Sequence, residues 1–255
     1  MTGRPSRTRI VVAATCFADA DPAIRIAVSL ARRLDGDIRA VLVEDEAVLQ
    51  SSALPFARAS PGSERSSRPV TPHDMHLAYL RDARRIEGSL EVATRRSTVQ
   101  WSFERRQGRA QALLDQAAGS DDLVLLGYHQ RRFEVGEIVL LDTSNPPRED
   151  LVKLGVEMAR ETGSVLRFFT DAPVQGGLTG EVDETPRRVL SGRSRVVQEH
   201  AADKERFVAH IARSRPYAVL MGRGDALELG AERIAEIARC PVIVDLRTRD
   251  TQTGP

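Results

Sequence analysis

Two glycines near the carboxyl end of the chain stand where α/β proteins often bind phosphate. The stretch 218–245, AVLMGRGDALELGAERIAEIARCPVIVD, predicts a strand, a turn, a helix and a second strand, with Gly222 and Gly224 in the turn. Glycines let backbone N–H groups approach a phosphate at the start of a helix, where the helix dipole favours an anion. Asp225 follows at once, and a carboxylate at this place repels such a ligand. The turn therefore has the glycines of a phosphate site, but its aspartate disfavours the binding of a phosphate.

The other reactive side chains form no recognisable catalytic or metal-binding set. His73 and His76 flank Asp74 in HDMH, but a metal site needs three or more ligands and no partner cluster accompanies them. We interpret this stretch as the exposed start of a helix. The sequence lacks the Gly-x-Ser-x-Gly, Walker, HExxH and Cys-x-x-Cys patterns. We therefore expect no catalytic residues and no metal.

An apolar segment follows an acidic strand end in VEDEAVLQSSALPFARA (43–59). Leu49, Leu54, Pro55 and Phe56 are expected near the carboxyl edge of the sheet, where ligands and partners dock. One interpretation is that these four residues form a partner surface or a lid. The other is that they pack the loop onto its own domain.

Charge and cysteine usage limit the classes of partner. The 37 basic and 36 acidic residues leave a net charge of +1 and no basic face for nucleic acid. Without a long apolar run or a signal-peptide pattern, we expect a cytoplasmic protein without membrane insertion. Cys16 and Cys240 are expected to be buried small apolar residues. Near a strand end, three arginines are expected either to face an anion, to be solvated, or to pair with the acidic residues 44–46; they are Arg105, Arg106 and Arg109.

Apolar strands alternate with amphipathic helices through the chain, which predicts an α/β fold with parallel strands and crossover helices. The order of elements in 9–45 recurs in 137–173. This recurrence predicts a duplication, with one repeat over 8–130 and a second over 136–247. Repeat one lacks a final helix and strand, and repeat two has a shortened middle. We expect a flexible loop over 57–72 and a disordered tail over 248–255.

The segments IVLLDTS, LVKLGVEMARETGSVL, YAVLMGRG and AERIAEIARCPVIV resemble the universal stress protein family in its tandem two-repeat form. The last segment is the most specific, because Ala231, Glu232 and Arg233 keep the family's distance to Cys240. The resemblance implies a Rossmann-like fold of the adenine nucleotide alpha hydrolase-like type. It also implies that parallel sheets from two repeats pack as a pseudo-dimer.

The resemblance allows the nucleotide site to be compared residue by residue. ATP-binding members hold phosphate with Gly-x-x-Gly, a spacer, and Gly-Ser or Gly-Thr at a helix start. Gly222 matches the first position, whereas Gly224 stands one residue early. Glu228 and Leu229 replace the Gly-Ser pair, and the spacer is shortened. The sequence therefore predicts that this loop does not hold a triphosphate in the family's usual way.

Asp142 and Ser144 retain the family's Asp-x-Ser at the end of a strand, a position that can face a ribose or adenine. The alternative is that Asp142 stabilises the turn and that Ser144 or Asn145 caps the next helix. In repeat one, Thr15 and Phe17 stand at the corresponding places and no phosphate loop follows.

Three functions remain open. The first is a non-enzymatic regulatory protein that binds a protein partner or a transport system, as its resemblance to cytosolic modules of ion transporters implies, with a homodimer also open. The second is a sensor of AMP, ATP or a related nucleotide that uses Asp142, Ser144, Gly222 and Gly224. The third is an enzyme, which has the least support because no general base or nucleophile stands out.

Overall fold

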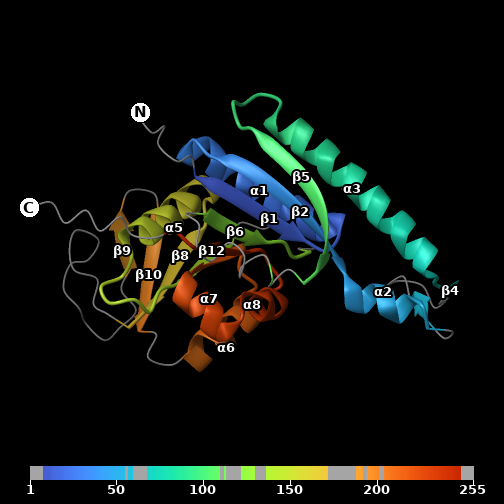
Figure 1. Ribbon diagram of the computed structural model, residues 1–255. Helices are drawn as coiled ribbons and strands as arrows, with labels where there is room; N and C mark the ends of the chain where they lie inside the picture. The colour runs from blue at the N-terminus through green and yellow to red at the C-terminus, as the bar shows by residue number, and fades with distance from the viewer. Residues whose placement is uncertain are drawn as a thin grey trace, which may run out of the picture.

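The computed structural model describes residues 8–54, 57–59, 68–109, 112, 122–129, 136–171, 188–191, 194–200 and 204–247. Within these ranges, ten strands form one sheet and two short strands form a separate ladder (Figure 1). The fold class is α/β, as the alternating pattern predicts. Pro55, Phe56, most of the helix predicted over 108–120 and the predicted tail 248–255 lie outside the described residues.

From one edge to the other, the strands of the large sheet are β5 (Trp101–Gly108), β2 (Asp37–Asp45), β1 (Arg9–Ala14), β6 (Asp122–Leu126), β12 (Val242–Asp245), β11 (Ala218–Gly222), β7 (Glu137–Leu141), β8 (Val165–Thr170), β10 (Ser194–His200) and β9 (Arg188–Ser191). Neighbouring strands run parallel except in the pairs β6–β12 and β10–β9. The central strands are buried along their whole length, which suits parallel strands covered on both faces.

Both halves of the chain contain a run of four strands in the same order. One run is β5-β2-β1-β6, counted inward from the sheet edge, and the other is β10-β8-β7-β11, counted inward from the strand next to the edge strand β9. Strand β12 continues the second run and pairs antiparallel with β6, with Val244 opposite Val124. Where the sequence suggested separate parallel sheets, the structure has one mixed sheet, because β12 satisfies the edge that repeat one leaves open.

Helices cover both faces of the sheet. One face packs against α1 (Phe17–Leu34), α3 (Pro72–Thr94) and α5 (Glu149–Thr162). The other face packs against α6 (Lys204–Ser214), α7 (Arg223–Leu229) and α8 (Ala231–Ala238). Helix α2 (Glu46–Ser52) lies beyond the sheet, beside the start of α3 (Figure 1). None of the helices in the described part of the chain is long and apolar enough to cross a membrane.

Two local boundaries in the first half are set by their own residues. Helix α1 begins at Phe17, so Pro22 lies inside the helix and not in its first turn. The predicted loop 57–72 contains order at both ends, since β3 (Arg58–Ala59) pairs with β4 (Arg68–Pro69). At its end, Thr71 and Asp74 form a reciprocal capping box that starts α3 at Pro72.

Candidate functional site

The predicted nucleotide residues lie at the carboxyl edge of three neighbouring parallel strands. The register places Gly222 of β11 opposite Asp245 of β12, and Met221 of β11 opposite Leu141 of β7. Asp142, which follows Leu141, therefore stands beside Gly222. Ligands of open α/β sheets bind at this edge, so the fold brings the predicted residues to the expected place.

The Asp142 carboxylate is buried and serves as an acceptor for its own loop. It receives hydrogen bonds from the Ser144 backbone N–H at 3.1 Å, the Ser144 hydroxyl at 2.5 Å and the Arg148 backbone N–H at 2.6 Å. Arg148 is the N-cap residue of α5, so neither Ser144 nor Asn145 caps this helix. Asp142 therefore closes the loop between β7 and α5, and its bonds are directed to the protein itself.

The predicted phosphate turn is a helix in the structure. Helix α7 starts at Arg223, directly after Gly222, and carries the buried Asp225 back over the strand ends. Asp225 accepts the Thr143 backbone N–H at 3.2 Å and the Thr143 hydroxyl at 2.6 Å. Two donors at the end of β7 are thus satisfied by a carboxylate of the chain, in the place where a bound anion would need them.

The glycines of this turn differ in their surroundings. A Cβ built on Gly222 would lie 3.6 Å from Asp225 Oδ2 and 3.8 Å from Asp142 Oδ1, which is ordinary van der Waals contact. A Cβ on Gly224 would meet nothing within 4 Å. The backbone of this turn therefore does not require glycine for space, and two carboxylates converge on it.

The electrostatics of this edge disfavour a further anion. Burial raises the pKa of Asp225, the Thr143 hydrogen bonds lower it, the nearby charge of Asp142 raises it, and Lys204 lowers it; the net shift is upward. Lys204 of α6 also pairs with Glu228 of α7, which ties the short helix to its neighbour.

A buried ion network that the sequence patterns did not reveal lies one strand further along. The Asp245 carboxylate receives Arg148 Nη2 at 3.0 Å, Arg247 Nη2 at 2.8 Å and Arg247 Nε at 2.9 Å. Arg148 also reaches Asp150 at 3.0 Å, and its buried Nε has no partner in the structure. Burial alone would raise the pKa of Asp150, but Arg148 and Arg247 lower it below its ordinary value. The sequence feature that could have indicated this network is Asp245, an acidic residue directly after the apolar run VIV.

The corresponding edge of the first half is closed by its own helix. The Thr15 hydroxyl and the Cys16 thiol donate to Asp19 at 2.9 and 3.1 Å, and Asp82 of α3 accepts the Phe17 N–H at 3.1 Å. Burial, followed by the nearby charge of Asp19, raises the pKa of Cys16 to about 12, so its thiol is protonated at neutral pH. Among the described residues, no group of three or more His, Cys, Asp or Glu side chains is placed to hold a metal ion.

The structure divides the predicted partner surface. Leu49 of α2 packs partly against the core, whereas Leu54 and its neighbour Val48 are exposed. Leu77, in the adjoining first turns of α3, is also exposed. The remaining predicted members, Pro55 and Phe56, are not among the described residues.

Two of the strand-end arginines are paired with carboxylates. Arg105 lies 3.5 Å from Glu44, and Arg106 lies 2.7 Å from Glu104. Pairing with residues 44–46, one of the alternatives left open by the sequence, therefore holds for Arg105, whereas Arg106 pairs with Glu104 of its own strand.

The likeness of this chain to known proteins is one of structure and not of sequence. No family model and no curated protein matches the chain. Among solved structures, a universal stress protein from Archaeoglobus fulgidus DSM 4304 matches 96% of this chain and 98% of its own length, with 11% sequence identity and a TM-score of 0.44. At this identity and score, the likeness carries no assignment of ligand or activity.

Proposed function

We propose that the chain is a cytoplasmic, non-enzymatic regulatory protein of the universal-stress type, built from two tandem repeats, that does not hold ATP in the family's usual way. The observation that carries this proposal is the pair of hydrogen bonds from Thr143 to Asp225. A phosphate at this edge would have to displace a buried carboxylate and approach Asp142 as well, and like charges at short distance in a buried site repel strongly. The common strand order of the two halves supports the tandem arrangement.

Calorimetric titration with ATP, ADP, AMP and cyclic dinucleotides tests whether the chain holds ATP in the family's usual way. The expected result is that no nucleotide binding to the wild-type chain depends on Asp142. Tight ATP binding that Asp142→Ala abolishes would instead establish the alternative, an adenine-nucleotide sensor using Asp142, Ser144, Gly222 and Gly224. Steady release of ADP from ATP would contradict the non-enzymatic assignment.

We further propose that Val48 and Leu54 on the α2 side contact a protein partner, for which a transport system is one candidate class and a second copy of the chain another. Both side chains are exposed although they are large and apolar, and α2, which carries Val48, lies against α3, which carries the exposed Leu77. Exposed apolar side chains are a feature of contact regions when they gather into a patch.

The variant Val48→Asp/Leu54→Asp tests this surface. Partner capture from extracts of the source cells, and self-association measured by light scattering, should both be compared with Val92→Asp. Val92 is an exposed valine on α3 outside this surface, so its substitution introduces an aspartate elsewhere. We expect association to be lost only in the double variant. Equal association in all three proteins would remove this surface from the proposal.

A further inference from the structure

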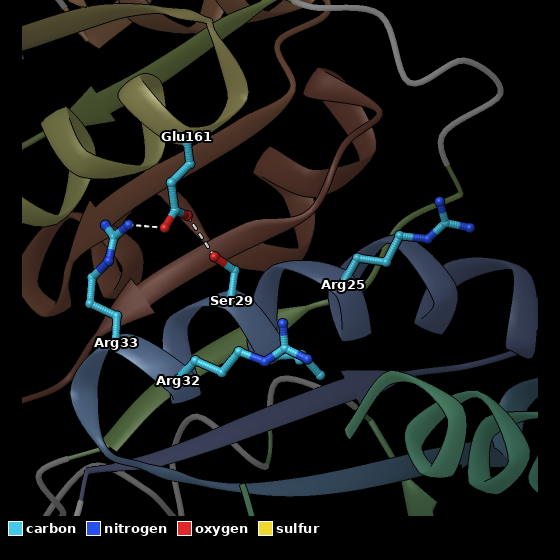
Figure 2. A pocket seen from close by; sticks show the side chains of 6 residues that line it. Arg25, Ser29, Arg32, Arg33 and Glu161 are labelled. Atoms are coloured by element: carbon cyan, nitrogen blue, oxygen red, sulfur yellow. Dashed lines mark hydrogen bonds and ion pairs between the residues drawn. The ribbon is translucent and has the colours of Figure 1, made fainter. Parts of the chain in front are cut away.

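A groove between helices α1 and α5 gathers arginine side chains away from the carboxyl edge of the sheet. It encloses about 460 Å³ and is lined by Arg25, Val28, Ser29, Arg32, Arg33 and Glu161 (Figure 2). Small-molecule sites typically enclose about 300–1,000 Å³. Three arginines and one glutamate line it, and two of these arginines are paired, Arg33 with Glu157 and Glu161, and Arg25 with Asp21. Arg32 is the lining arginine whose positive charge is not matched by a carboxylate among the described residues.

One wall of the groove is held together by the protein itself. Arg33 of α1 pairs with Glu157 of α5 at 2.9 Å and also with Glu161. The Ser29 hydroxyl donates to Glu161 at 2.6 Å (Figure 2). These bonds join the first helix of one half to the first helix of the other. They hold the two helices at a fixed distance and neutralise the charge of Arg33. This arginine therefore forms a wall of the groove and is not available to bind an anion.

Arg32 carries the charge that remains. Its Nη2 donates to the Ala93 carbonyl at 3.0 Å, and it forms no ion pair with any described carboxylate. A guanidinium has five N–H donors, so this single bond leaves most of its hydrogen-bonding capacity unused. Arg25 lies seven residues earlier on the same helix face and pairs with Asp21 at 2.8 Å. Both side chains are on the α1 side of the groove (Figure 2).

We propose that this groove binds a small dianion of the phosphate-ester or pyrophosphate class, with Arg32 as its principal contact and Arg25 as a second. The planar guanidinium fork matches the geometry of phosphate oxygens, and such charge-assisted bonds are about twice as strong as neutral ones. The volume of this open groove suits a small molecule, and a net charge of only +1 gives little general attraction to a nucleic acid. Because the groove spans the two halves, its occupant stabilises the folded state by mass action.

Titration with inorganic pyrophosphate, followed by calorimetry and by the thermal unfolding midpoint, tests the proposal. Arg32→Gln should weaken pyrophosphate binding by at least about tenfold, the loss expected for one charged hydrogen-bonding partner. Arg32→Lys keeps the charge but lacks the fork, so its affinity should be intermediate. Arg84→Gln, an exposed arginine of α3 outside the groove, should bind like the wild type. Parallel titrations with inorganic phosphate and a hexose phosphate distinguish a free anion from an ester.

Three results would overturn the site. The first is the absence of saturable binding of all three probes to the wild-type chain. The second is an equal loss in Arg84→Gln and Arg32→Gln, which would indicate general charge attraction. The third is a loss caused by Asp142→Ala and not by Arg32→Gln, which would place the probe at the sheet edge. Without ligand, the thermal unfolding midpoint of Arg32→Gln should equal that of the wild type, as for an ordinary surface substitution, so a loss of binding does not reflect a loss of folding.

Discussion

At the scale of single residues, the carboxylates at the strand ends of the second half accept hydrogen bonds from the protein's own donors. Asp142 holds the β7–α5 loop, Asp225 takes both donors of Thr143, and Asp245 receives two guanidinium groups. In a buried site, each such carboxylate is stabilised by the partners it has and destabilised by the loss of water. Substitutions at these residues should therefore have large and distinct effects.

Asp245→Ala should lower the free energy of unfolding by about 3–5 kcal/mol, because it leaves Arg148 and Arg247 without the buried carboxylate that both contact. Asp150→Ala is the matched control in the same network. Its side chain is 46% exposed, so its removal should cost less than about 1 kcal/mol. Urea unfolding followed by circular dichroism measures both. Equal losses in the two variants would contradict the special role of Asp245.

Asp225 predicts a dependence of stability on pH. Burial makes its pKa higher in the folded chain than the value of about 3.9 expected when unfolded. A raised carboxyl pKa contributes stability below the unfolded value, and that contribution is lost as pH rises through the folded pKa. The free energy of unfolding of the wild type, minus that of Asp225→Asn, should therefore fall from about pH 4 towards neutrality. Urea titrations at several pH values measure this difference, and a rise with pH would refute the assignment.

At the scale of elements, a helix closes the strand-end site of each half. Helix α7 replaces the phosphate loop that the glycines suggested, and the start of α1 covers the end of β6 in the first half. The presence of Gly222 and Gly224 in the sequence does not by itself distinguish a phosphate loop from the start of a helix. The segment DALEL is a good helix former by composition, but its burial of Asp225 depends on Thr143, 82 residues earlier in the chain.

Gly127→Ala should lower the free energy of unfolding by about 1–3 kcal/mol through overpacking. A Cβ on Gly127 would lie 2.5 Å from the Asp19 carbonyl oxygen, which belongs to the first turn of α1. Gly88→Ala is the control, because a Cβ there meets nothing within 4 Å in the middle of α3. It should stabilise the chain by about 0.5–1 kcal/mol through helix propensity. Thermal unfolding compares the two, and opposite signs are expected.

At the scale of the whole molecule, strand β12 joins the strands of the two halves into one sheet. Strand β12 pairs parallel with β11 and antiparallel with β6, so both halves contribute to one sheet. The core residues on each face include side chains from both halves. We therefore expect the described halves to unfold together and not as two independent units.

Trp101, the only tryptophan of the sequence, reports on this coupling from the edge strand β5. Phe207→Leu changes a buried residue of α6 in the other half and should cost about 1 kcal/mol. The Trp101 fluorescence midpoint in urea should shift by the same amount as the midpoint from circular dichroism. An unmoved fluorescence midpoint with a shifted circular dichroism curve would mean that the halves unfold separately.

The sequence by itself determined the α/β class, the positions of most strands and the helix faces that are buried, as in the run of Ile24, Ala27, Val28 and Ala31. These features follow from local periodicity, because a segment buries the side that its own spacing makes apolar. Only the tertiary structure decided that β12 pairs with β6, that Asp225 occupies the donors of Thr143, and that Arg148 meets Asp245. Each of these contacts joins residues more than 80 positions apart, and local patterning does not specify which distant polar groups will meet.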